Sequence, residues 1–108
     1  MIVRLEDSRT ECQDLTAGNA YVVIGIEADD LRILNDQGRP FLYPTELFEI
    51  VDAREPKDWI VEFGPDGERY SYTPRLNRIG FFEDFFDNSH EAVTTFWQTV
   101  NQRLAAVA

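Results

Sequence analysis

The sequence predicts an α+β protein in which a β-rich front is followed by a helical tail. Over residues 1–52, short runs of β-branched and aromatic residues alternate with polar turns, the pattern of antiparallel strands. Over residues 80–107, apolar residues instead recur three and four positions apart, which is the helical period. The chain has 108 residues, of which 44% are hydrophobic. This is enough for one core without a disulfide or a metal, so we expect a single domain over residues 1–108.

The first two strands are separated by a long polar segment. Residues 2–5 are short and β-branched, and residues 6–19 form a loop that ends in a turn containing Gly18. Residues 21–26 are almost all β-branched or aromatic and give the strongest strand signal in the chain. Gly25 inside this run indicates a bend or the close approach of another backbone.

The strands that follow are joined by short turns. Asp29 and Asp30 mark one turn, and residues 35–38 have the composition of a hairpin connection. Pro40 cannot donate to a ladder, so it belongs at the start of a strand or on an edge. Residues 44–47 predict a single helical turn. The three strands expected here are residues 31–34, 41–43 and 48–51.

This order of elements resembles the SH3-like barrel. A first strand and a long polar loop precede three consecutive antiparallel strands, a one-turn helix and a short last strand. The segment from Tyr43 to Ile50 (YPTELFEI) falls where such domains place their short helical turn. The resemblance covers residues 1–52 and is topological. The ALYDY-type motif of peptide-binding SH3 domains is absent, so recognition of polyproline is not implied.

An additional hairpin is expected over residues 57–74. Two strands, residues 59–63 and 68–72, flank a four-residue turn with two glycines. A loop of this length places Phe63 opposite Glu68 and Glu62 opposite Arg69. The same register puts one set of apolar side chains on a single face: Trp59, Val61, Phe63, Tyr70 and Tyr72.

Two helices are expected over residues 80–107, packed on the barrel. Phenylalanine pairs spaced four residues apart predict the first. Asn88, with Glu91 three residues later, resembles a capping box and would start the second. The second helix carries one apolar stripe: Val93, Phe96, Trp97, Val100, Leu104 and Val107.

The net charge of −10, from twenty acidic and ten basic residues, restricts the partners. A surface this negative repels phosphate backbones and anionic lipid, so we expect neither a nucleic acid nor a membrane as ligand. The charge serves either solubility alone or the binding of a basic protein. The N-terminal residues lack the features of a secretory signal and no apolar run is long enough for a membrane span, so we expect a cytoplasmic protein. A bacterial origin is a further expectation, for which the sequence carries no direct signal.

No residue pattern predicts catalysis, a metal site or a cofactor. His90, the only histidine, is expected on the surface at the start of a helix, and Cys12 has acidic neighbours that disfavour a thiolate. Glu27, Asp29 and Asp30 offer oxygen ligands for calcium, but their spacing does not match a calcium loop. We therefore expect a protein that is not an enzyme, and an enzyme that relies on carboxylates alone is the alternative.

Two functions fit these features. The first is a non-enzymatic acidic module that binds a basic partner, such as an immunity or antitoxin-type inhibitor. The second is an accessory or regulatory domain that self-associates as a homo-oligomer through its aromatic surface. For the first, aromatic rings beside carboxylates suit lysine and arginine side chains of a partner. Burial of these rings in the core is the alternative. The residues expected to bind the partner are Glu83, Asp84, Asp87, Glu91, Phe82 and Phe86.

Overall fold

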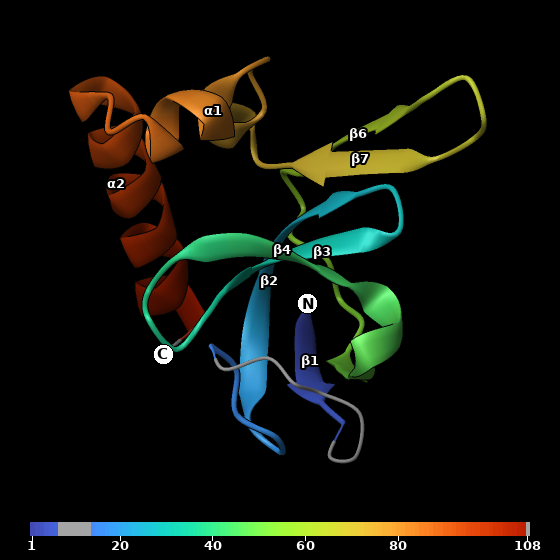
Figure 1. The fold of residues 1–108 in the computed structure, drawn as a ribbon. Coiled ribbons are helices and arrows are strands. Elements are labelled where there is room, and N and C mark those ends of the chain that lie inside the picture. Colours follow the sequence, from blue (N-terminus) through green and yellow to red (C-terminus); the bar gives the residue numbers. More distant parts are fainter. Residues whose placement is uncertain (7–13, 108) are drawn as a thin grey trace. The chain divides into compact units, whose positions relative to one another are not determined.

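The computed structural model contains a sheet of seven strands followed by two α-helices (Figure 1). It describes residues 1–6 and 14–107. The chain divides into two compact units, Met1–Tyr72 and Thr73–Ala108, which we call the sheet unit and the helical unit. This arrangement confirms the α+β class and the predicted order of sheet before helices.

All pairings between strands in the sheet unit are antiparallel. The strand order is β4-β3-β2-β1-β5, while β7 pairs with β2 and β6 pairs with β7. A 3₁₀ turn, η1 (Thr45–Leu47), lies between β4 and β5. The strands are β1 (Ile2–Leu5), β2 (Ala20–Glu27), β3 (Asp30–Leu34), β4 (Pro40–Pro44), β5 (Phe48–Asp52), β6 (Ile60–Phe63) and β7 (Arg69–Tyr72).

One apolar core joins strands β1 to β5 of the sheet unit. Its side chains alternate along β1 and the first half of β2, until the register of β2 shifts between Val23 and Gly25. Pro40 begins β4, as its missing N–H requires. Trp59 and Leu47 pack on the core from outside the strands. The buried members are Val3, Leu5, Leu15, Tyr21, Val23, Ile26, Leu31, Ile33, Tyr43 and Phe48.

Gly25 lies at a close approach between strands, as predicted. It pairs with Arg32 on β3 and with Tyr72 on β7, and the register of β2 against β3 shifts between Val23 and Gly25. A Cβ atom at Gly25 would lie 2.2 Å from Cε1 of the Tyr72 ring. The absence of a side chain at Gly25 therefore leaves the space that this ring occupies.

The predicted register of the β6–β7 hairpin is wrong by one residue. Phe63 pairs with Arg69 and Glu62 with Tyr70, because the turn uses Gly67 with φ +79°. The Gly67 N–H donates to the carbonyl of Gly64, and the Gly64 N–H donates to the carbonyl of Glu68, which is the geometry of a turn closed by a glycine bulge.

The slip redistributes the side chains over the two faces of the hairpin. Val61 and Phe63 share a face with Arg69 and Ser71, whereas Ile60 and Glu62 share the other face with Tyr70 and Tyr72. The predicted Glu62–Arg69 pair is therefore not formed, and Arg69 makes a salt bridge to Glu55 instead. The expected single aromatic face does not exist.

The helical unit contains η2 (Pro74–Leu76), α1 (Phe81–Phe86) and α2 (His90–Val107). Asn88 ends α1 and does not cap α2, which corrects the predicted capping box. Its φ is +61°; its N–H donates to the carbonyl of Phe85, and the N–H of Ser89 donates to that of Asp84. These two bonds form a Schellman motif, for which asparagine is suited because it tolerates the left-handed conformation.

The buried face of α2 is rotated relative to the predicted stripe. Ala92 and Thr99 are buried beside Phe96 and Val100, while Leu104 is exposed. Thr99 satisfies its hydroxyl by donating to the carbonyl of Thr95. Within the described residues, none of the helices has the length and apolar character of a membrane span.

Candidate functional site

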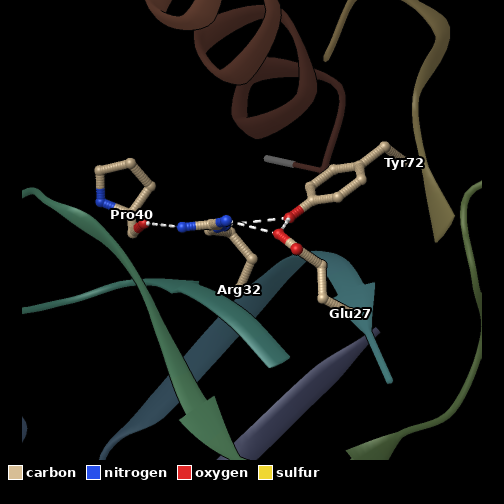
Figure 2. A network of polar contacts seen from close by, with 4 residues as sticks. All are labelled: Glu27, Arg32, Pro40 and Tyr72. Carbon is tan, nitrogen blue, oxygen red and sulfur yellow. Dashed lines mark hydrogen bonds and ion pairs between the residues drawn. The ribbon is translucent and has the colours of Figure 1, made fainter. Parts of the chain in front are cut away.

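A buried arginine organises the polar contacts at the junction of β2, β3 and β7 (Figure 2). Arg32 lies between the buried residues Leu31 and Ile33 and is itself only 6% exposed. Its Nε donates to the Tyr72 hydroxyl at 2.9 Å, and its two terminal nitrogens donate to Glu27 at 2.5 Å and to the Pro40 carbonyl at 2.9 Å. Figure 2 shows the guanidinium between Pro40 on one side and Tyr72 and Glu27 on the other.

The network fixes β7 to the rest of the sheet. The Tyr72 hydroxyl also donates to Glu27 at 2.5 Å, so one carboxylate receives hydrogen bonds from both β3 and β7. Burial of the Tyr72 ring raises the pKa of its hydroxyl far above the ordinary value. Since charge and hydrogen-bonding groups are matched within the protein, we assign this network a positioning role for the β6–β7 hairpin.

The hairpin presents β6 as an open edge. Among the described residues, β6 pairs with β7 alone, and all four of its residues are exposed. Three of them are apolar, and Phe63 is 70% exposed. An exposed apolar edge strand is uncommon in soluble proteins, because its free N–H and C=O groups can pair with another chain.

The predicted partner-binding residues on α1 divide into buried and exposed sets. Phe82 and Phe86 are half-buried, and Phe82 packs edge-on against Phe81, Phe85 and Phe96 at centroid distances of 5.1–6.3 Å. Phe81 and Phe85 are fully in the core of the helical unit. The rings of Phe82 and Phe86 therefore serve packing on one side and are accessible on the other.

The four predicted carboxylates do not form one acidic patch. Glu83 and Asp87 are exposed and lie one helical turn apart. Asp84 makes a salt bridge of 2.9 Å to Arg78. Glu91 lines a shallow hollow of about 230 Å³ together with Arg75 and Arg78. Cations thus lie beside two of the four carboxylates.

The negative charge belongs mainly to the sheet unit. Met1–Tyr72 contains sixteen acidic and seven basic residues, a net charge of −9, whereas Thr73–Ala108 contains four and three, a net charge of −1. The sheet unit is therefore the stronger attractor for a cation at long range.

The other residues considered for catalysis or metal binding are His90, Cys12 and the Glu27 group. His90 is exposed in the first turn of α2, as expected. Glu27 faces Arg32 and Tyr72, which removes it from a calcium site with Asp29 and Asp30. In the described part of the chain, no group of three His, Cys, Asp or Glu residues could hold a metal ion. Cys12 lies outside the described residues.

Two features of the sheet unit were not predicted from the sequence: the buried network around Arg32 and the exposure of β6. Arg32 carried a visible signal, because a single charged residue inside an apolar strand must find partners within the protein. The exposure of β6 carried none, since Ile60, Val61 and Phe63 have the composition of a buried strand and only the tertiary structure decides their accessibility.

The fold and these surfaces define a small α+β protein with an acidic, open-edged antiparallel sheet and a nearly neutral helical unit. No family model, curated protein or solved structure matched the chain.

Proposed function

We propose that the protein is a non-enzymatic module that binds a basic protein, in the manner of an immunity or antitoxin-type inhibitor. The observation that carries the proposal is the concentration of charge, −9 in the sheet unit, together with exposed apolar side chains on the same unit. Charge accelerates the encounter with a cationic protein, and apolar contacts then hold it.

The sheet unit is proposed to be an SH3-like barrel. The strand order, with β1 between β2 and β5, and the position of η1 before β5 support this topology. The rings of Tyr43 and Phe48 meet edge-on with centroids 6.4 Å apart, so the ends of β4 and β5 contribute to one core. Long-range NOEs between β5 and the β3–β4 hairpin would test whether the sheet curves in this way.

Affinity capture with the full chain tests the partner. A tagged chain is incubated with lysate of the source cell at low salt, and each retained protein is identified, purified and returned to the chain. The proposal expects a basic protein that binds stoichiometrically, with an association rate that falls steeply as salt rises. Recovery of no protein, or of one whose association ignores salt, would overturn it.

Two matched variants, each with three carboxylates replaced by amides, distinguish the two candidate surfaces. One replaces three exposed carboxylates of the sheet unit, Asp29→Asn, Glu46→Gln and Asp66→Asn. The other replaces three of the helical unit, Glu83→Gln, Asp87→Asn and Glu91→Gln. Both remove three negative charges, so a difference between them reports location and not net charge. We expect the first variant to slow association more.

If the second variant slows association more, the contact surface lies on α1, where the sequence predicted it. In that case Phe82 and Phe86, which keep an accessible side, are the apolar residues to substitute next. Asp84 was left out of this variant because its salt bridge to Arg78 makes its removal a structural change as well.

A further inference from the structure

Three strands of the sheet unit lie at an edge of the sheet, and they differ in how well the edge is protected. Among the described residues, β4, β5 and β6 each pair with a single neighbour. β4 begins at Pro40 and ends at Pro44, neither of which can donate a hydrogen bond to an added strand. A row of free backbone groups is thus interrupted at both ends of β4.

β5 is protected in a different way. Its register against β1 shifts between Ile2 and Val3, which leaves Val51 without a partner residue and twists the edge. Charged pairs also occupy this strand, since Glu49 faces Arg4 and Asp52 forms a salt bridge of 2.7 Å to Arg54. Both features discourage pairing with another chain.

β6 has neither the prolines of β4 nor the register shift of β5, and Glu62 is its one charged residue. Its four residues pair with β7 in an unbroken register and include no proline. Ile60 is 39% exposed, Val61 43% and Phe63 70%. Of the three edges, β6 is therefore the one with neither a proline nor a register shift to hinder an added strand.

The direction of its backbone groups follows from the register. Gly64 and Glu68 are a hydrogen-bonded pair, because the Gly64 N–H donates to the Glu68 carbonyl at 2.8 Å. Hydrogen-bonded and non-hydrogen-bonded pairs alternate in an antiparallel ladder. Glu62 is therefore bonded to Tyr70, whereas the N–H and C=O groups of Val61 and Phe63 point away from β7.

The hydrogen bonds on the other edge of β7, which faces β2, agree with this assignment. The Arg69 carbonyl accepts a hydrogen bond of 2.8 Å from the Ala28 N–H. The backbone groups of Arg69 therefore point towards β2 and away from Phe63. The outward groups of Val61 and Phe63 are thus available at the edge.

The charge around the edge selects the occupant. Between residues 57 and 68 the chain has one basic residue, Lys57, and four acidic ones, Asp58, Glu62, Asp66 and Glu68. The local net charge is −3, and that of the sheet unit is −9. A second copy of the chain would bring the same negative charge to the edge, whereas a cationic strand would be attracted.

We infer that β6 accepts an extended basic segment of the partner as an added antiparallel strand, through the backbone of Val61 and Phe63. This rests on the proposed function and specifies its contact. Side chains of the added strand that lie beside Val61 and Phe63 would be apolar, and those on the face of Glu62 would be lysine or arginine. The preferred ligand is therefore a segment in which apolar and basic residues alternate.

A synthetic peptide tests the inference directly. The probe is an eight-residue peptide of alternating valine and lysine, and the control is the same peptide with the valine nitrogens methylated. The control keeps the charge but removes the N–H groups that would face β6. The full chain should bind the first at least ten times more tightly than the second. Amide signals of Val61 and Phe63 should shift and exchange more slowly with solvent.

Val61→Pro is the matched protein variant. Its lost N–H points outward, so the β6–β7 ladder is retained, and protection of the Glu62 and Tyr70 amides checks that the hairpin is intact. We expect this variant to bind the peptide at least ten times more weakly. If the hairpin is lost, Val61→Lys replaces it, since an added cation on the edge repels the basic strand without removing a backbone group.

The outcomes separate this inference from the proposed function. A peptide that binds both variants as well as the native chain, or that shifts amides elsewhere, overturns the edge contact. A captured basic protein that binds tightly but does not displace the peptide overturns it also, while leaving the proposed function intact. A salt-resistant dimer that dissociates in Val61→Pro would assign the edge to a second copy, and this too overturns the inference.

Discussion

Arg32 shows how one charged side chain can be accommodated in the middle of a β-strand. Its neighbours Leu31 and Ile33 point into the apolar core, so the guanidinium lies on the opposite face. Three hydrogen bonds satisfy it there, two of them with side chains. Gly25 pairs with both Arg32 and Tyr72, and its missing side chain is what allows the ring to reach the guanidinium.

The Tyr72 hydroxyl predicts a loss of stability at alkaline pH. Because burial raises its pKa above the ordinary value of about 10, the folded chain retains a proton that the unfolded chain releases above that pH. The stabilisation is complete below about pH 10 and declines as pH rises further. Urea unfolding between pH 8 and 11 should show a steeper fall for the native chain than for Tyr72→Phe.

Tyr21 provides the control for this measurement. Burial also raises its pKa, but it lies in β2 and its hydroxyl donates to Asp36, away from the Arg32 network. Tyr21→Phe should remove a smaller part of the alkaline slope. Parallel curves for the native chain and Tyr72→Phe would show that the Tyr72 proton is not held as the structure indicates.

The C-terminal end of α1 depends on one residue, Asn88. Asn88 adopts φ +61° and places two N–H groups on the last carbonyls of the helix. Asn88→Ala should destabilise the protein by about 1 kcal/mol, the usual cost of a left-handed conformation for a residue with a Cβ. Asn88→Gly retains the conformation without that cost and should be nearly neutral, as measured by urea unfolding.

Equal losses for the two variants would contradict the assigned cap. They would indicate that the Asn88 side chain, and not its backbone conformation, stabilises this part of the chain. The comparison is well matched because Asn88 is exposed, so neither substitution removes core packing.

Elements were predicted well from the sequence where a local signal defines them. β-branched runs located β1 and β2, and Pro40 marked the start of β4. The prediction failed where one residue adopts a left-handed conformation. Gly67 shifted the hairpin register by one position, and Asn88 ended one helix when it was expected to begin the next. The same residue types also serve ordinary turns and caps, so composition alone does not distinguish these uses.

The candidate surfaces were predictable only in part. Helical spacing puts Phe81 and Phe85 on one face of α1 and Phe82 and Phe86 on another, but only the structure shows that the first pair is buried and the second half-buried. The neutralising arginines came from η2 and the loop that follows it, so their position beside Asp84 and Glu91 required the tertiary structure. The open edge at β6 likewise depends on which strands pair, which no local pattern encodes.

The unequal charge of the two units predicts that salt changes their stabilities unequally. Repulsion within the sheet unit, at −9, destabilises it more than the helical unit, at −1, and salt screens this repulsion. Trp59 and Trp97, the two tryptophans, lie one in each unit, so Trp97→Phe and Trp59→Phe give separate fluorescence reporters. Raising sodium chloride from 10 to 300 mM should increase the urea midpoint reported by Trp59 more than that reported by Trp97.

Identical shifts would contradict this expectation. They would mean that the two units unfold together, so that screening the charge of the sheet unit changes the stability of both units equally. Sedimentation at both salt concentrations provides the control, because a change in association state would alter the midpoints independently of charge screening.

The pairing of β1 has a consequence for the order of events during synthesis. Its N-terminal position means that it leaves the ribosome before its partner β5, since Leu5 pairs with Phe48 and Ile2 with Asp52. At roughly 5–20 residues per second, translation leaves this edge uncovered for a time on the order of seconds. Arg4 lies in the middle of β1, and we expect its charge to disfavour incorrect pairing until Glu49 arrives as its partner. The same side chain would then act twice, first on the nascent strand and afterwards in the finished sheet.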